Sequence, residues 1–145
     1  MIEQMEGVFL TPLKQIYHPK GDVFHGMKKS DPGFSSFGEA YFSTVHAGEV
    51  KPWKKHIRMT LNLIVPVGKI RFVLHDDRTN STTFGETISV EIGSENYQRL
   101  TIEPGIWMAF EGLDEGLNLL LNIADMEHDP DEVDRAELDR FDYPH

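Results

Sequence analysis

A short basic segment holds the residues of this chain that are best suited to chemistry. Residues 51–58 read Lys-Pro-Trp-Lys-Lys-His-Ile-Arg, in a chain with 14 lysines and arginines and a formal net charge of −10. Cations, an imidazole and an indole gathered in an acidic protein predict a site for a small anion that carries a ring, such as a nucleotide or a sugar phosphate. The alternative is a solvated, lysine-rich approach to the apolar run at 61–67.

Two residues of this segment are candidates for proton transfer. Imidazole titrates near neutral pH, so His56 is suited to general-base catalysis. Lys54, or its neighbour Lys55, is the second candidate, because cations that lie close together make an amine easier to deprotonate. The alternative for His56 is a hydrogen-bonded histidine that lines the fold and has no catalytic role.

Three aromatic residues could stack on a base or a sugar, namely Trp53, Trp107 and Phe110. Trp53 is the best candidate because it lies among the lysines. The alternative for all three is ordinary packing in the core or at the mouth of a barrel.

Composition excludes several classes of site. The chain has no cysteine, which excludes disulfides, thiolate nucleophiles and cysteine-based zinc sites. Its seven histidines are scattered, so we expect no metal site, and neither a G-x-S-x-G elbow nor a Walker phosphate loop occurs. The acidic balance argues against nucleic-acid binding, and no apolar stretch is long enough to span a membrane. The remaining possibilities are metal-free acid–base chemistry and ligand binding. We also expect a cytoplasmic protein with a single domain over residues 1–145.

Short alternating strands dominate the pattern along the chain. Glycine and proline turns, such as Gly68 and Pro104-Gly105, separate them and leave little room for long helices. Strand, tight turn and strand in succession predict an all-β fold, a cupin jelly-roll β-barrel. The expected strands are residues 38–45, 60–67, 69–74, 87–92, 99–102 and 117–123.

Two other segments differ from the strands. Residues 28–37 (KKSDPGFSSF) predict a loop. The acidic C-terminal part predicts a short helix or turn over residues 131–139, because Pro130 is followed by Asp131 and Glu132. We expect it to fold onto the outside of the barrel or across a dimer interface, and a specific acidic docking tail is the alternative.

Several motifs together resemble a known family. They are residues 41–48 (YFSTVHAG), 50–56 (VKPWKKH), 67–70 (VGKI), 74–78 (LHDDR) and 102–107 (IEPGIW). In this order they resemble the dTDP-4-dehydrorhamnose 3,5-epimerase-like (RmlC-like) cupin family, and more closely its short, epimerase-related branch, over about residues 8–142.

The resemblance implies a function as well as a fold. Members are homodimeric β-barrels that act on a nucleotide-linked 4-keto-6-deoxysugar in deoxysugar or surface-polysaccharide biosynthesis. A proton is removed from a carbon next to the keto group and returned on the other face, and neither a metal nor an organic cofactor is needed.

Matching the family's motifs to this sequence implies roles for individual residues. Lys51 falls on a phosphate-contacting arginine and Lys54 on the base histidine, while His56 matches a second histidine of the short branch. A shift of one step would place His56 in the base position. Lys20 matches a second diphosphate contact, and His25 stands where a glutamate contacts thymine. Trp53, Arg58 and Trp107 complete the predicted substrate-binding set.

Two departures from the family leave alternatives open. Met108 replaces the histidine of the later hairpin, and no tyrosine occurs near residues 122–126. The predicted function is therefore a nucleotide-sugar epimerase or isomerase in which Lys54 or His56 moves the proton. The alternative is a non-catalytic cupin that binds a sugar nucleotide or a partner protein.

Overall fold

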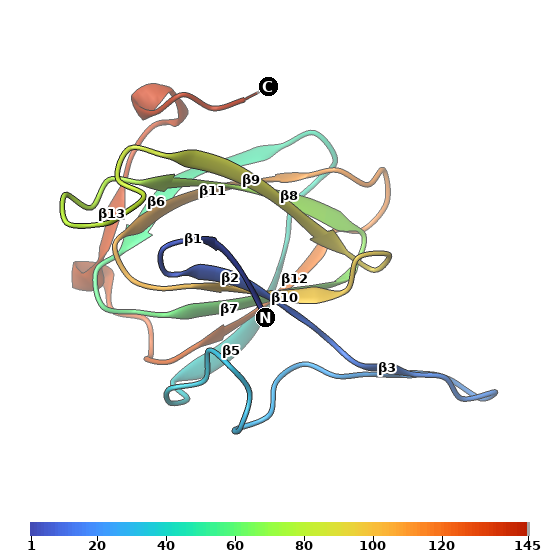
Figure 1. Ribbon diagram of the computed structural model, residues 1–145. Coiled ribbons are helices and arrows are strands. Elements are labelled where there is room, and N and C mark those ends of the chain that lie inside the picture. Colours follow the sequence, from blue (N-terminus) through green and yellow to red (C-terminus); the bar gives the residue numbers. More distant parts are fainter. Residues whose placement is uncertain (145) are drawn as a thin grey trace.

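The computed structural model describes residues 1–144, which form two antiparallel sheets that face one another, as in a jelly-roll barrel (Figure 1). In the larger sheet the order is β1 (Ile2–Met5), β2 (Val8–Pro12), β10 (Gln98–Ile102), β7 (Leu61–Val67), β12 (Leu119–Ala124) and β5 (Glu39–Thr44). In the smaller sheet it is β13 (Val133–Arg135), β6 (Val50–His56), β11 (Ile106–Gly112), β8 (Lys69–Asp76) and β9 (Thr87–Gly93). The predicted all-β cupin fold is confirmed.

Alternating side chains form the core between the sheets. On β8 the inward residues are Ile70, Phe72 and Leu74, all fully buried, as their spacing predicted. Strand β7 is buried on both faces over its first five residues, which explains its unbroken apolar sequence. All six predicted strands are present, and the strand expected to start after the Pro104-Gly105 turn is β11. The structure adds β1, β2, β6 and β13 to the two large sheets.

Two glycines make the predicted hairpin turns possible. Gly68, between β7 and β8, has φ of 83°, and Gly105, just before β11, has φ of 90°. Residues that carry a side chain rarely adopt such positive φ angles. A Cβ on Gly68 would also lie 2.2 Å from the carbonyl oxygen of Leu117, so the turn and the approach of the neighbouring loop both require glycine.

An N-terminal arm projects from the barrel. Strands β3 (Gln15–Ile16) and β4 (Val23–Phe24) pair only with each other and form a two-stranded sheet (Figure 1). At the base of the arm, the Tyr97 hydroxyl donates to the carbonyl of His25 over 2.8 Å. The predicted loop at residues 28–37 contains no strand and returns the chain from the arm to β5.

The C-terminal segment packs on the outside of the smaller sheet. It contains two 3₁₀ turns, η1 (Pro130–Glu132) and η2 (Leu138–Arg140), with β13 between them. The prediction of a short helix or turn is thus correct for its two ends, while the middle is a strand. Trp53 anchors the segment, because its indole nitrogen donates to the Leu138 carbonyl over 2.9 Å and its ring meets Phe141 and Tyr143 edge-on.

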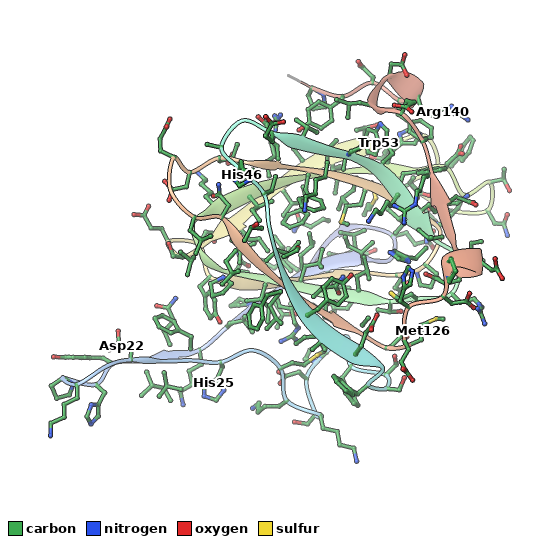
Figure 2. The ribbon with its side chains drawn as sticks, turned by 180° about the vertical axis from the view of Figure 1, so that it is seen from behind. Asp22, His25, His46, Trp53, Met126 and Arg140 are labelled. Atoms are coloured by element: carbon green, nitrogen blue, oxygen red, sulfur yellow. The ribbon has the colours of Figure 1, made fainter. Side chains whose placement is uncertain are left out.

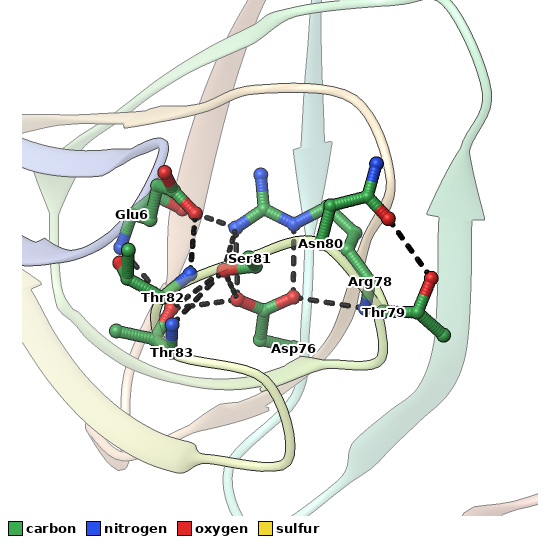
Figure 3. Close-up of polar contacts among 8 residues, drawn as sticks. All are labelled: Glu6, Asp76, Arg78, Thr79, Asn80, Ser81, Thr82 and Thr83. Atoms are coloured by element: carbon green, nitrogen blue, oxygen red, sulfur yellow. Dashed lines mark hydrogen bonds and ion pairs between the residues drawn. The ribbon is translucent and has the colours of Figure 1, made fainter.

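A buried aspartate ties the first hairpin to the loop between β8 and β9 (Figure 3). Asp76 is fully buried and accepts from Arg78 Nε over 2.8 Å and from Thr83 Oγ1 over 2.6 Å. Arg78 also donates to the carbonyl of Glu6, in the turn after β1. Burial alone would raise the pKa of Asp76, but the hydrogen bonds from Arg78, Ser81 and Thr83 outweigh it and hold the pKa far below its usual range.

Replacing Arg78 with alanine should lower the free energy of unfolding by about 3 kcal/mol, because it leaves the buried carboxylate of Asp76 without its cation. The stabilisation from Asp76 exists above the ordinary aspartate pKa and is lost as the pH falls towards the depressed one. The difference in the free energy of unfolding between wild type and variant should therefore become smaller as the pH is lowered from about 7 to about 3. Urea unfolding followed by circular dichroism at both pH values measures it.

Lys69→Ala is the matched control. Lys69 Nζ lies 3.9 Å from Glu91 Oε2, and both side chains are about half exposed, so the change should stay below about 1 kcal/mol. An equal loss of unfolding free energy in the Arg78→Ala and Lys69→Ala variants would contradict the stabilising role given to Asp76 and Arg78.

Candidate functional site

Strand β6 presents its side chains alternately to the two faces of the smaller sheet. Trp53 faces outward under the C-terminal segment, so Lys54 and His56 face inward. The cross-strand partner of Lys54 is Met108, which belongs to the core between the sheets. The basic segment of the sequence is therefore a strand with two separate surfaces.

A bulge adds Lys51 to the inward surface. The register shifts between Met108 and Phe110, so Lys51 lies opposite Phe110 on the inward surface, although it is three positions away from Lys54 and strict alternation would place it on the other face. Its ammonium group lies 5.5 Å from the centre of the Phe110 ring. Pro52 is tolerated in this strand because the ladder is interrupted at the bulge.

These side chains line a pocket of about 460 Å³ beside β13. Arg135 on β13 is the register partner of Lys54, so three cations meet there: Lys51, Lys54 and Arg135. Within residues 1–144 none of the three forms an ion pair with a carboxylate. Like charges on opposing strands repel one another, so this cluster is suited to an anionic ligand. Met108, Phe110 and Glu137 also line the pocket.

The environment of Lys54 lowers the pKa of its ammonium group. Burial by the surrounding protein lowers the pKa of Lys54 most, and the charges of Arg135 and then Lys51 lower it further. The lowered pKa of Lys54 that the sequence predicted is confirmed in direction. Burial is its largest cause, and one of the neighbouring charges, Arg135, was not expected from the sequence.

His56 is held by a buried carboxylate from the C-terminal segment. Its Nδ1 is hydrogen-bonded to Glu132 Oε1, and Glu132 is 2% exposed. The backbone N–H groups of Arg58 and Met59 each donate to Glu132 Oε2 over 3.2 Å. Burial would raise the pKa of Glu132, but the hydrogen bond from His56 and those from the backbone prevail and lower it.

This pairing suits His56 to act as a base. A carboxylate on Nδ1 fixes the orientation of the ring and its tautomer, and leaves Nε2 as the basic nitrogen. Glu132 is not visible as a partner of His56 in the sequence, because it lies 76 residues further along the chain. The only signal was its place at the expected start of the C-terminal helix or turn.

The structure corrects the roles expected for the two tryptophans. Trp53 is 1% exposed and packs with Trp107, which is 7% exposed, in a second apolar cluster on the outer face of the smaller sheet. Trp53 is among the residues that line the pocket, but its ring belongs to the outer cluster, because it points away from the side of its neighbour Lys54. Trp107 likewise points away from the side of its neighbour Met108. Both rings contact Phe141, and Trp53 also contacts Tyr143.

Three other predicted binding residues also lie away from this pocket. Arg58 Nη2 is paired with Asp129 over 3.0 Å on the surface. Lys20 lies in the turn of the arm and His25 at its base, and the arm projects away from the barrel of its own chain (Figure 2). Of the predicted site, Lys51 and Lys54 therefore share the pocket with Arg135. His56 lies two positions beyond Lys54 on the same face of β6, outside the residues that line the pocket, and is paired with Glu132.

Two further findings concern the described part of the chain. Residues 1–144 contain no group of three or more histidine, aspartate or glutamate side chains placed to hold a metal ion. None of their helices is long and apolar enough to cross a membrane.

Comparison with known proteins identifies the family. A dTDP sugar isomerase from Desulfovibrio desulfuricans G20 is 40% identical, with a TM-score of 0.90 over 94% of this chain and 87% of that one. The chain belongs to the RmlC-like cupin family. The predicted family is thus confirmed. A dTDP-4-dehydrorhamnose 3,5-epimerase from Sulfolobus tokodaii shares the fold, with 22% identity and a TM-score of 0.86 over 99% of this chain and 84% of that one.

A curated relative of this RmlC-like chain is the probable low-salt glycan biosynthesis epimerase Agl13 of Haloferax volcanii. It is 33% identical over 98 residues, which are 64% of this chain and 62% of the Haloferax protein. The match thus spans less than two thirds of that relative. No protein-family model matches the chain.

Proposed function

We propose that this protein is a metal-free epimerase or isomerase that acts on a nucleotide-linked 4-keto-6-deoxysugar in deoxysugar or surface-polysaccharide biosynthesis. The observation that carries the proposal is the inward face of β6, where an imidazole paired with a buried carboxylate lies on the same strand as two lysines of the cationic pocket. The likeness to a dTDP sugar isomerase and to a glycan biosynthesis epimerase supports it. The expected cytoplasmic location stays a prediction.

The proposed roles follow from the charges. Lys51 and Arg135 bind the diphosphate, because both are cations that line the pocket. His56, held by Glu132, removes the proton next to the keto group. Lys54, which keeps part of its side chain exposed, supplies a positive charge where an enolate oxygen develops, because a fixed cation stabilises that negative charge. The sequence left Lys54 and His56 as alternative bases, and the contact with Glu132 favours His56.

Deuterium exchange tests the chemistry directly. Wild-type protein incubated in D₂O with a panel of nucleotide-linked 4-keto-6-deoxysugars should incorporate deuterium next to the keto group, as read by NMR or mass spectrometry. His56→Asn should reduce the rate by about 10²- to 10⁴-fold, because it removes the general base.

His46→Asn is the matched control, since it makes the same change at an exposed histidine outside the pocket and should leave exchange intact (Figure 2). If no sugar of the panel exchanges while dTDP still raises the melting temperature, the protein is the non-catalytic sugar-nucleotide binder instead.

Titration with dTDP tests the cationic pocket. Lys51→Gln and Arg135→Gln should each raise the Kd for dTDP by about 10-fold or more, because each removes one charge-assisted hydrogen bond to the diphosphate. Isothermal titration calorimetry measures both variants. Arg140→Gln is the control on the same C-terminal segment, because Arg140 stacks on Phe141 on the outer side. An unchanged Kd in both pocket variants would rule out the diphosphate site.

We also propose that the protein is a homodimer in which the arm of one copy packs on the other. Ile16, Val23 and Phe24 on the arm are exposed apolar residues. An apolar recess of about 300 Å³ lies on the outer face of the larger sheet, near exposed Phe42, and β5 at its edge has one free side. Apolar patches and unpaired edges of this kind are typical of interfaces.

Light scattering with size-exclusion chromatography should give twice the mass of the chain. Changing Val23 and Phe24 together to aspartate should yield a folded monomer, since β3 and β4 pair only with each other and the change removes one ring contact within the chain, that of Phe24 with Tyr97. Phe84→Asp is the matched control, because Phe84 has the same exposure as Phe24, 54%, but lies in the loop between β8 and β9. A monomeric wild type at micromolar concentration would contradict the dimer.

A further inference from the structure

Lys54 lacks the carboxylate partner that several other lysines of this chain have. Three lysines each lie within 4.0 Å of an aspartate or glutamate oxygen, namely Lys28, Lys55 and Lys69. The register partners of Lys54 are instead a cation, Arg135, and an apolar residue, Met108. No ion pair within residues 1–144 includes Lys54. Its amine therefore stands in the pocket without a neutralising group.

This environment makes the amine of Lys54 a better nucleophile. Only the unprotonated amine attacks a carbonyl carbon. Burial, and then the charges of Arg135 and Lys51, lower the pKa of Lys54, so more of the amine is present at a given pH than in a solvated lysine. Lys54 also keeps part of its surface exposed and lines the pocket, so a ligand there can reach its Nζ.

Two cations beside this amine are suited to hold a phosphate. Lys51 lies on the same strand and Arg135 on β13, and both line the pocket. A phosphate group accepts charge-assisted hydrogen bonds from several cations at once. The pocket, of about 460 Å³, also has an apolar side formed by Met108 and Phe110. It is therefore suited to a small molecule that carries both a phosphate and a carbonyl group.

The next lysine of the strand lies in a different environment. Lys55 points to the outer face, where its Nζ lies 3.7 Å from Asp134 Oδ2 and 5.1 Å from the centre of the Trp107 ring. A carboxylate at that distance repels an incoming phosphate. Two lysines that are adjacent in the sequence should thus differ in their reaction with a phosphorylated carbonyl compound.

We propose that Lys54 is a covalent modification site, at which its amine forms a reversible imine with phosphorylated aldehydes and ketones, such as the open-chain forms of sugar phosphates. Lys51 and Arg135 bind the phosphate and bring the carbonyl carbon to Nζ. The adduct fills the cationic pocket, so it competes with a diphosphate ligand. The inference goes beyond the proposed function, because it needs the pocket but no epimerase activity.

The step balances in atoms and electrons. The lone pair of the neutral Nζ attacks the carbonyl carbon, and the electron pair of the C=O π bond moves to the oxygen. After a proton passes from nitrogen to oxygen, the carbinolamine loses one water and the C=N bond of the imine forms. No oxidant or reductant is consumed, and addition of water reverses the step.

Pyridoxal 5′-phosphate is a probe for this site, because it carries an aldehyde and a phosphate. Wild-type protein incubated with less than one equivalent and then reduced with borohydride should carry the label at Lys54, as read by peptide mass spectrometry. Pyridoxal, which has no phosphate, should label Lys54 about 10-fold or more slowly, because it makes no charge-assisted hydrogen bond to the flanking cations. Inorganic pyrophosphate should protect Lys54, because it binds the same cations.

Three variants separate the nucleophile from the charge. Lys54→Arg keeps the positive charge but forms no imine, so it should lose the label while its melting temperature shows a folded protein. Arg135→Gln should slow labelling by pyridoxal phosphate about 10-fold and labelling by pyridoxal much less, because it removes one phosphate contact. Lys55→Gln is the matched control and should keep the label, since Lys55 lies on the outer face.

A label spread evenly over the exposed lysines would overturn the inference. So would a label at Lys54 that neither the phosphate of the probe nor added pyrophosphate affects. Labelling is read without a sugar nucleotide, so this inference and the proposed function can fail separately. A protein that shows no deuterium exchange should still carry the label at Lys54.

Discussion

The pairing of β13 with β6 is the interaction on which the site depends. It sets Val133 opposite His56 and Arg135 opposite Lys54, and the turn just before it, η1, brings Glu132 to the imidazole. The buried indole of Trp53 holds the segment that follows through its bond to Leu138. A register shift of one residue would turn Arg135 to the outer face, because side chains alternate along a strand.

The same pairing divides the charges of the basic segment between two faces. On the outer face, Lys55 Nζ lies 3.7 Å from Asp134 Oδ2, so that lysine is neutralised, and it also lies over the Trp107 ring. On the inner face, Lys54 meets a second cation, Arg135. Burial lowers the pKa of Lys54 most, and the charges of Arg135 and Lys51 lower it further. Three cations that form no ion pair within residues 1–144 thus meet on one face of an acidic chain, which favours an anionic ligand.

Most of the fold could be predicted because it depends on local patterns. Alternation along β8 and the glycine turns at Gly68 and Gly105 are visible in a few adjacent residues. Strand β6 escaped prediction because lysines and Pro52 hide its alternation, and it is a strand only because β11 and β13 pair with it on both sides. The same pairing made Trp53 and Trp107 core residues rather than ligand contacts.

The sequence by itself determined the barrel, the family and the candidate segment, because spacing along one strand and turn residues are local properties. The tertiary structure decided which side chains of that segment face inward. It placed the rings of Trp53 and Trp107 in the outer cluster, paired His56 with Glu132, and brought Tyr41 to Asn122 from another strand. Each of these contacts joins residues between 54 and 85 positions apart or depends on a bulge, so it exists only once the strands have found their register.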